Sequence, residues 1–235
     1  MNDADSLRDN PSAILDLIHQ NFRGIIFQQE KIDVARQVLQ SLPKTPTIIV
    51  ELGTYIGVSA LAFGQFLKEQ NKKVAECKVY SMETEANLAN IAKDFVNLAG
   101  LSNIVQIVQG DSAQSLKRLQ SDGLSKIDVL FIDHWEERYL PDLQLCEDLG
   151  LLHPGTVIIA DNTDIPGAPE YLTYVRSGGR KPFAYSTRTL TTGAGKNPKR
   201  PVSVSIYFNV AFKSDWSFRT CWKLRRLTPR HKDME

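Results

Sequence analysis

The sequence predicts an α/β fold in which a mostly parallel β-sheet is covered by helices on both faces. Short apolar runs recur along the chain, and a stretch with helical period follows each of the first four. Strands that are apolar on both faces and alternate with helices are typical of parallel sheets with right-handed crossovers. The five runs cover residues 47–51, 78–83, 103–108, 127–133 and 155–161.

Helices are predicted before and between these strands. Asn10 followed by Pro11 is a typical helix start, and a second helix is predicted over 29–40. The clearest helical pattern covers 86–99, and Gly100 supplies its stop. Its large apolar residues, which fall on one face, are Leu88, Ile91, Phe95 and Leu98.

The elements after the fifth run are different. Residues 168–176 predict a helix, and 183–190 and 201–208 predict two strands joined by a loop that contains glycine and proline. The segment 212–235 interleaves basic with aromatic residues, a pattern found in nucleic-acid binding but also in solvated basic extensions. We favour the extension, because the net charge is near zero.

Length and composition favour one domain. The 235 residues, 42% of them hydrophobic, suffice for one sizeable core. We expect a single domain over 1–235, with N-terminal helices in 1–40, the α/β core in 46–208 and the basic extension in 212–235.

Charge and cysteine usage exclude several classes of protein. The formal net charge of +1 provides no global attraction for nucleic acid or membrane, so we expect neither as a partner. Three widely spaced cysteines form no disulfide framework or zinc pattern. The polar N-terminus is no secretory signal, and no apolar run approaches the roughly 20 residues of a membrane span. We therefore expect a soluble, cytoplasmic protein.

A glycine-containing turn follows the first predicted strand. Glu51 closes that strand, Gly53 and Gly57 flank the turn, and Ser59 lies near the start of the next helix. Glycines there let a ligand approach the backbone at the carboxyl edge of the sheet. The spacing is not that of the dinucleotide fingerprint, so a smaller adenosyl ligand is favoured. The alternative is an ordinary tight strand–helix turn.

The next two strands also end in polar residues. Glu83 stands at the tip of the second strand, where an acid can accept hydrogen bonds from both hydroxyls of a ribose. Without the glycine turn, it would be a solvated strand-end glutamate. Asp111 and Ser112 follow the third strand, where either residue can contact an adenine edge or cap the following helix.

Two aspartates close the fourth and fifth strands. Asp133 follows the fourth strand, and Asp161 with Asn162 follows the fifth. Because parallel strands open into one crevice at their carboxyl ends, these three side chains would supply hard oxygen ligands that suit Mg²⁺. The alternative is that each aspartate caps the segment after it.

Four stretches of the sequence stand in the order and spacing of one known family. They are ELGTYIGVSA (51–60), FIDHWEERYLPD (131–142), GLLHPGTVIIADN (150–162) and PGAPEYLTYVR (166–176). On these motifs the sequence resembles the catechol O-methyltransferase family over roughly residues 25–208.

The resemblance implies a Rossmann-like class I methyltransferase fold. Its sheet would be seven-stranded and mostly parallel, with helices on both faces and an antiparallel last strand. It also implies S-adenosylmethionine (SAM) and Mg²⁺ as cofactors, and methyl transfer to a small hydroxylated aromatic substrate. The metal site would be Asp133, Asp161 and Asn162. The cosubstrate site would be Phe27, Glu51, Gly53, Tyr55, Ser59, Glu83, Ser112, Asp133, His134 and Trp135.

Two of these residues are aromatics with a further expected role. Tyr55 is expected near the sulfonium, whose positive charge an aromatic ring attracts. Trp135 is expected either to shield the acceptor from water or to pack in the core.

Two positions depart from the family pattern. The family places a lysine, regarded as its general base, three residues after the first metal aspartate, where this sequence has Glu136. It also holds the second catechol hydroxyl with a glutamate, and Thr191 stands at the corresponding position of this sequence. Glu136 is expected to act as the base, to ligate the metal or to favour a helix start through the dipole. These changes leave open an acceptor other than catechol, or a protein that binds SAM without methylating catechols. The sequence does not indicate the oligomeric state.

Overall fold

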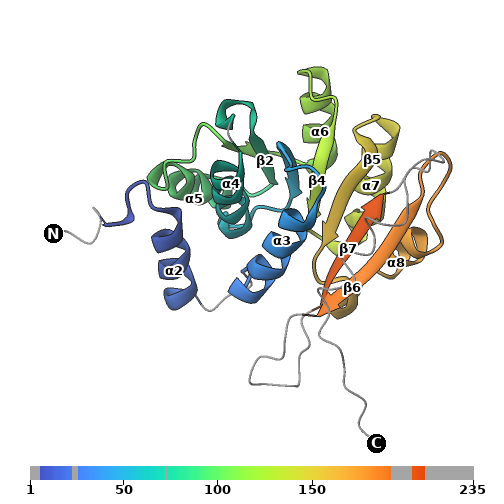
Figure 1. Ribbon diagram of the computed structural model, residues 1–235, viewed down its shortest axis with the longest axis horizontal. Coiled ribbons are helices and arrows are strands. Elements are labelled where there is room, and N and C mark those ends of the chain that lie inside the picture. The colour runs from blue at the N-terminus through green and yellow to red at the C-terminus, as the bar shows by residue number, and fades with distance from the viewer. Residues whose placement is uncertain (1–5, 23–25, 72, 192–202, 210–235) are drawn as a thin grey trace, which may run out of the picture.

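The computed structural model describes residues 6–22, 26–71, 73–191 and 203–209. Its centre is a seven-stranded sheet with the order β3-β2-β1-β4-β5-β7-β6 (Figure 1). The strands are β1 (Ile48–Leu52), β2 (Lys78–Glu83), β3 (Val105–Gln109), β4 (Ile127–Ile132), β5 (Leu152–Ala160), β6 (Tyr185–Thr191) and β7 (Ser203–Asn209). All seven strands predicted from the sequence are present.

Strand directions follow the prediction as well. The neighbours from β3 to β5 pair in parallel, and β7 pairs antiparallel with both β5 and β6. The chain adds β2 and β3 on one side of β1 and then returns to add β4 on the other side. The boundary between β1 and β4 is therefore the topological switch point, where open α/β sheets bind their ligands.

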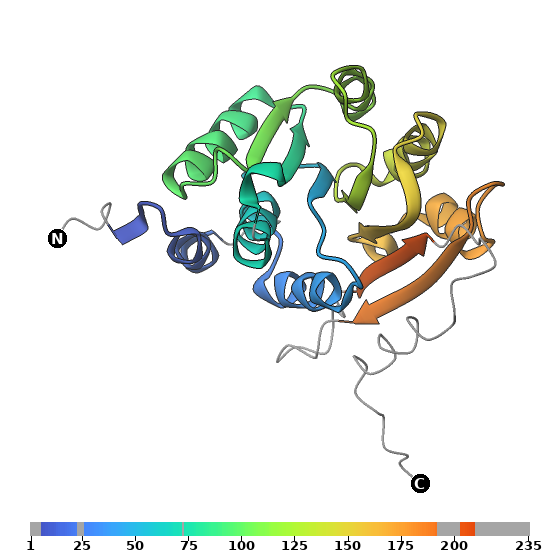
Figure 2. The same cartoon turned by 45° about the horizontal axis from the view of Figure 1, so that its top comes forward.

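Helices cover both faces of the sheet (Figure 2). Residues of α2 to α5 pack in one apolar cluster and residues of α6 to α8 in a second. Successive strand residues alternate between the clusters, so Ile158 belongs to one and Ile159 to the other. The helices are α2 (Pro11–Asn21), α3 (Gln29–Ser41), α4 (Val58–Gln70), α5 (Ala86–Leu98), α6 (Ser112–Ser121), α7 (Tyr139–Asp148) and α8 (Pro169–Arg176).

The first helix begins as its sequence predicts. Asn10 is the N-cap residue of α2, and its side-chain oxygen accepts a 3.2 Å hydrogen bond from the backbone N–H of Ala13. Pro11 follows at the first helical position, where its missing N–H costs nothing.

The buried face of α5 differs from the stripe of large apolar residues. Ala89, Ala92 and Val96 are buried, whereas Ile91 is 42% exposed. A methyl group added at Gly57 would lie 3.0 Å from Cβ of Ala92. The helix thus packs so closely on the glycine turn that only small side chains fit between them.

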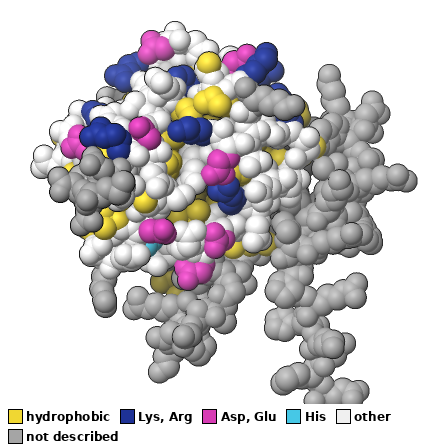
Figure 3. Space-filling view, turned by 60° about the vertical axis from the view of Figure 1, so that its left-hand side comes forward, with side chains coloured by type: hydrophobic (Ala, Val, Ile, Leu, Met, Phe, Trp, Pro, Cys, Tyr) yellow, Lys and Arg dark blue, Asp and Glu magenta, His cyan; other side chains and the backbone are white. Residues whose placement is uncertain are grey.

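Surface charge is mixed in the described part of the chain. On the face shown in Figure 3, acidic and basic side chains are intermingled, so no broad field of one sign covers it. None of the helices among the described residues has the length and apolar character of a membrane span. The basic segment 212–235, including its alternating aromatics, lies outside the described residues.

Candidate active site

A cleft of about 580 Å³ opens at the carboxyl ends of β1, β2 and β4, next to the switch point. This volume lies within the range of small-molecule sites. Most residues of the cosubstrate site inferred from the resemblance line the cleft, together with Asn162 and Glu136. These cosubstrate residues are Phe27, Gly53, Tyr55, Ser59, Glu83, Ser112, Asp133, His134 and Trp135.

The glycine turn after β1 allows two strand ends to approach each other. Gly53 has a φ of +98°, and a methyl group added there would lie 2.2 Å from the carbonyl oxygen of Asp133. A side chain at this position would therefore displace the end of β4. Tyr55, in the same turn, has a φ of 50°, which is uncommon for a residue with a side chain.

Glu83 links the second strand to that turn. Its Oε2 accepts a 2.8 Å hydrogen bond from the backbone N–H of Tyr55, and its Oε1 accepts a 2.9 Å bond from the N–H of Glu85. Oε1 also accepts a 3.4 Å hydrogen bond from the Thr84 hydroxyl. Because each carboxylate oxygen has about two acceptor positions, Oε2 can still accept from a ligand. Glu83 is 9% exposed and lines the cleft, which are the properties a ribose-binding acid needs.

Asp142 holds two cleft residues from different segments, Ser112 at the start of α6 and His134 after β4. Its Oδ2 accepts a 2.5 Å hydrogen bond from the Ser112 hydroxyl and lies 2.8 Å from Nε2 of His134. Burial alone would raise the pKa of Asp142, but the hydrogen bonds from His134 and Ser112 outweigh it, so this pKa lies below its usual value. Asp142 lies on α7 and is 1% exposed.

Asp142 is not among the site residues predicted from the sequence, although it ends the motif FIDHWEERYLPD. A buried aspartate among the apolar positions of a helix was the available signal. Asp111, by contrast, accepts a 3.1 Å hydrogen bond from the Gln114 N–H and caps α6, as one of its two expected roles required.

Glu51 is the exception among the inferred cosubstrate residues, because it does not line the cleft. It is fully buried behind the turn, where Ser81 and Ser59 donate hydrogen bonds to it. Burial raises the pKa of Glu51 to about 7, although those two hydrogen bonds oppose the shift. Since Ser59 does line the cleft, Glu51 can act on a ligand through Ser59 rather than by direct contact.

The aromatic residues of the site have different environments. Phe27 is 4% exposed and packs edge-on against Phe131 with ring centroids 5.0 Å apart. Tyr55 is 38% exposed and packs edge-on against Phe22. Trp135 is 72% exposed, so the alternative that it packs in the core is wrong. Its indole is available to cover a bound molecule.

Oxygen donors from the ends of β4 and β5 meet beside the cleft. The side-chain nitrogen of Asn162 lies 3.4 Å from Oδ1 of Asp133. Burial and the charge of Asp161 raise the pKa of Asp133 well above its usual value. The half-buried carboxylate of Asp133 and the buried carboxylate of Asp161 repel each other, and with the amide of Asn162 they form a donor set that suits a hard divalent cation.

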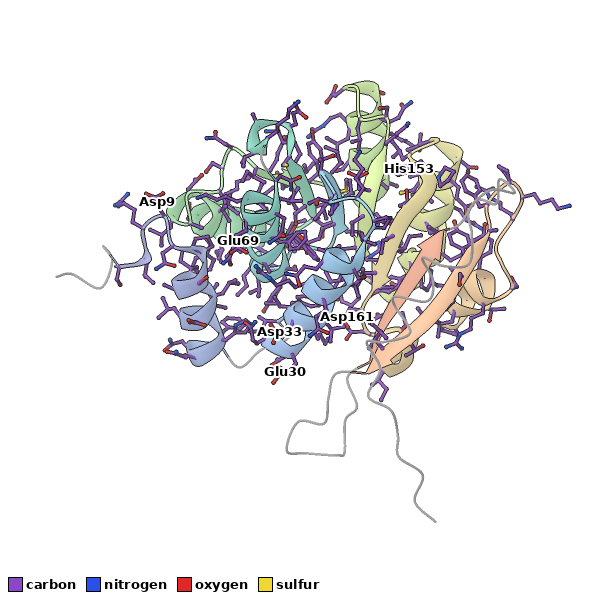
Figure 4. The ribbon with its side chains drawn as sticks, viewed as in Figure 1. Asp9, Glu30, Asp33, Glu69, His153 and Asp161 are labelled. Carbon is purple, nitrogen blue, oxygen red and sulfur yellow. The ribbon has the colours of Figure 1, made fainter. Side chains whose placement is uncertain are left out.

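A buried lysine, which is not among the site residues predicted from the sequence, completes this cluster. Lys31 of α3 is 7% exposed, and its ammonium donates hydrogen bonds to Oδ2 of Asp161 and, at 3.4 Å, to Oδ1 of Asn162. Figure 4 shows Asp161 beside α3, with Glu30 and Asp33 on the same helix. The available signal was a lysine four residues before Ala35, on the buried stripe of the helix.

The residues that depart from the family pattern are only partly described. Glu136 lines the cleft at the start of a short 3₁₀ helix, Glu136–Arg138. Among the described residues, no three His, Cys, Asp or Glu side chains converge to hold a metal. Glu136 is therefore not a third carboxylate ligand beside Asp133 and Asp161 in this geometry. Thr191 ends β6, and its side chain lies outside the described part.

Known methyltransferases are similar to this chain in sequence. A family model described as a methyltransferase domain matches residues 50–163. Catechol O-methyltransferase of Sus scrofa is 38% identical over 136 residues, which are 57% of this chain and 70% of the pig protein. The chain belongs to the catechol O-methyltransferase family. By family and fold it is thus a SAM-dependent O-methyltransferase.

Other members of the catechol O-methyltransferase family match over a smaller share of their length. The Bos taurus protein is 35% identical over 65% of this chain and 53% of its own. Catechol O-methyltransferase B of Danio rerio is 33% identical over 72% of this chain and 63% of its own. The chain thus spans between about half and two thirds of these two relatives.

Solved structures share the fold. An O-methyltransferase from Streptomyces achromogenes, solved with SAM, has a TM-score of 0.62 at 17% identity over 84% of this chain and 89% of that one. An O-methyltransferase from Bacillus cereus, solved with SAH, has a TM-score of 0.56 at 16% identity over 87% of this chain and 99% of that one. The Rossmann-like methyltransferase fold expected from the sequence is thereby confirmed.

Proposed function

We propose that this protein transfers the methyl group of SAM to a hydroxyl of a small hydroxylated aromatic, with the assistance of Mg²⁺. The observation that carries the proposal is the meeting of Asp133 with Asp161 and Asn162 at the edge of a cleft lined by Glu83 and the glycine turn. Asp133 belongs to both the metal donor set and the cosubstrate cleft. The two sites are therefore adjacent, as they must be if an acceptor hydroxyl beside the metal donors is to attack the sulfonium methyl.

The cosubstrate is held by residues at or just after the ends of β1, β2, β3 and β4. Glu83 accepts hydrogen bonds from the ribose hydroxyls, and Ser112 and His134, held by Asp142, face the adenine. The ring of Tyr55 stabilises the positive sulfonium. The names of the pig, cow and zebrafish relatives and the SAM-bound structural neighbour support this assignment.

The acceptor is positioned by the metal donors and the exposed rim of the cleft. Asp133, Asp161 and Asn162 would hold Mg²⁺, which supplies Lewis acidity that lowers the pKa of a coordinated hydroxyl. Trp135, together with Pro166 in the wall, covers the acceptor ring and excludes water. Glu136 faces the same cleft and accepts the hydroxyl proton when that hydroxyl lies within hydrogen-bond reach.

The two departures from the family pattern shape the choice of acceptor. A carboxylate at Glu136, where the family has a lysine, repels anionic substrates and tolerates neutral or cationic ones. Threonine at position 191 has no carboxylate that could accept a hydrogen bond from a second hydroxyl. We therefore propose a phenolic acceptor that does not require catechol-type bidentate recognition.

A screen of phenols and catechols tests this function. Methyl transfer from isotopically labelled SAM is measured with and without Mg²⁺, for the wild type, Asp161→Asn and the control Asp122→Asn. Asp122 is exposed at the end of α6. Turnover that requires Mg²⁺ and Asp161, but not Asp122, supports the proposal. Tight SAM binding without turnover on any phenol would indicate a SAM-binding protein with another reaction.

A further inference from the structure

The ammonium of Lys31 lies against two of the three proposed metal ligands. It donates hydrogen bonds to Oδ2 of Asp161 and to Oδ1 of Asn162. A cation held by Asp161 and Asn162 would coordinate these same oxygens. Asp161 is itself 2% exposed, so the ion pair is shielded from water on both sides.

A buried lysine is costly, and its surroundings show what compensates for the cost. Burial and the nearby carboxylates of Asp161, Glu51 and Glu136 raise the pKa of Asp133, and the positive charge of Lys31 opposes that rise. The two nearest acidic residues on α3, Glu30 and Asp33, are exposed. Lys31 is therefore oriented toward the strand ends rather than toward the acids of its own helix.

We infer that the Lys31 ammonium is an intrinsic counter-ion of the Asp161–Asn162 pair, and that a divalent cation binds only by displacing it. This inference rests on the proposed function. A metal and an ammonium cannot both lie within bonding distance of the same oxygen atoms without strong repulsion. The flexible four-carbon stem of lysine allows the ammonium to withdraw while α3 stays in place.

Two consequences follow for the metal site. Lys31 lowers the affinity for Mg²⁺, because each binding event must break a charge-assisted hydrogen bond. Lys31 also stabilises the buried position of the Asp161 carboxylate when no metal is bound. Without Lys31, that carboxylate would be a buried charge with no compensating partner. The protein thus holds its metal ligands in place before the metal arrives.

Calorimetric titration with MgCl₂ tests the inference. Lys31→Met keeps the apolar stem and removes the charge, and it should bind Mg²⁺ about tenfold more tightly or better than the wild type. Lys31→Arg keeps the charge and should show no such gain. Lys93→Met, an exposed lysine of α5, is the matched control and should equal the wild type. Thermal unfolding should show a larger Mg²⁺-induced rise in Tm for Lys31→Met than for the wild type.

The outcomes separate this inference from the proposed function. If the wild type and Lys31→Met bind Mg²⁺ equally well, the lysine is no competitor and only the metal site stands. If neither protein binds Mg²⁺, the metal site and the inference both fail.

A measurement on the wild type covers the case in which Lys31→Met does not fold. Reductive methylation followed by mass spectrometry should modify Lys31 faster in saturating Mg²⁺ than in EDTA, while the rate at Lys93 stays the same. An unchanged rate at Lys31 overturns the inference.

Discussion

The backbone N–H of Tyr55 donates a 2.8 Å hydrogen bond to Oε2 of Glu83, across 28 positions of the chain. The acid at the end of β2 therefore holds the glycine turn at the end of β1 in the conformation that opens the cleft. Because Tyr55 has a φ of 50°, this turn carries backbone strain that the hydrogen bond offsets. Glu83 thus has one role in shaping the site and another in binding the ligand.

The first prediction concerns the Glu83 carboxylate. Glu83→Ala should weaken SAM binding by about 1–3 kcal/mol, because charge-assisted hydrogen bonds to the ribose are lost. Glu83→Gln retains one acceptor oxygen and should lose less. Isothermal calorimetry measures both affinities, and circular dichroism checks that each variant is folded. A folded Glu83→Ala protein with wild-type affinity would remove this residue from the site.

The positions of Glu83, Asp133 and Asp161 could be predicted from the sequence, because each follows an apolar run of strand length. The carboxyl ends of parallel strands lie at one edge of a sheet, so the strand assignments alone predict that these acids share that edge. The switch point lies between β1 and β4, where those ends meet. Strand periodicity and turn residues are local signals, and they were sufficient here.

Other features of the site depend on packing between distant elements. Lys31 reaches Asp161 across 130 positions, and no local pattern indicates which strand end a helical lysine meets. The most deeply buried residues of α5 are small because the helix approaches Gly57 closely, while Leu88, Phe95 and Leu98 of the predicted stripe pack against the core from the side. The family resemblance places Glu51 in the cosubstrate site, and in the fold its side chain is buried and does not line the cleft.

The second prediction is that turnover requires a divalent cation held by Asp133, Asp161 and Asn162. EDTA should abolish methyl transfer while leaving SAM binding largely intact, because the metal orients the acceptor. Asp161→Asn should lower Mg²⁺ affinity by at least the roughly 10–100-fold that the loss of an outer-shell partner costs. Turnover and calorimetry are measured side by side. Full activity in EDTA would make the two aspartates structural caps.

The third prediction concerns the pH dependence that Glu51 imposes on stability. Folding raises the pKa of Glu51 from 4.5 to about 7 through burial. The folded state therefore binds a proton that the unfolded state releases, so stability falls as pH rises from about 4.5 to about 7 and stays low above that. Glu51→Gln has no carboxylate to ionise at this position. Its free energy of unfolding should exceed that of the wild type by up to roughly 3 kcal/mol between pH 5 and pH 8.

Urea unfolding at several pH values measures this difference. Glu76→Gln is the control, since Glu76 is 64% exposed and should leave the pH profile of the wild type unchanged. A Glu51→Gln variant whose stability runs parallel to that of the wild type from pH 5 to pH 8 would show that Glu51 is ionised over the whole range.

The last prediction concerns Glu136, which stands where the family has a lysine. It lines the cleft three residues after Asp133, and within the described residues its carboxylate has no hydrogen bond or ion pair. It is therefore available to an acceptor hydroxyl. Glu136→Gln keeps the shape and removes the basicity, so turnover should fall by about 10²-fold or more if Glu136 takes the proton. The neighbouring Glu137 is exposed, and Glu137→Gln is the matched control.

A second variant separates proton transfer from substrate choice. Glu136→Lys restores the family residue and reverses the charge beside the metal donors, so it should raise any weak activity on catechols and on anionic phenols. Steady-state rates for neutral, cationic and anionic acceptors are compared among the wild type and the three variants. If Glu136 both accepts the proton and selects acceptors by charge, Glu136→Gln loses turnover and Glu136→Lys changes the preferred acceptor. If both Glu136 variants match the wild type on every active acceptor, the carboxylate only favours the start of its helix, and specificity resides in other parts of the cleft wall.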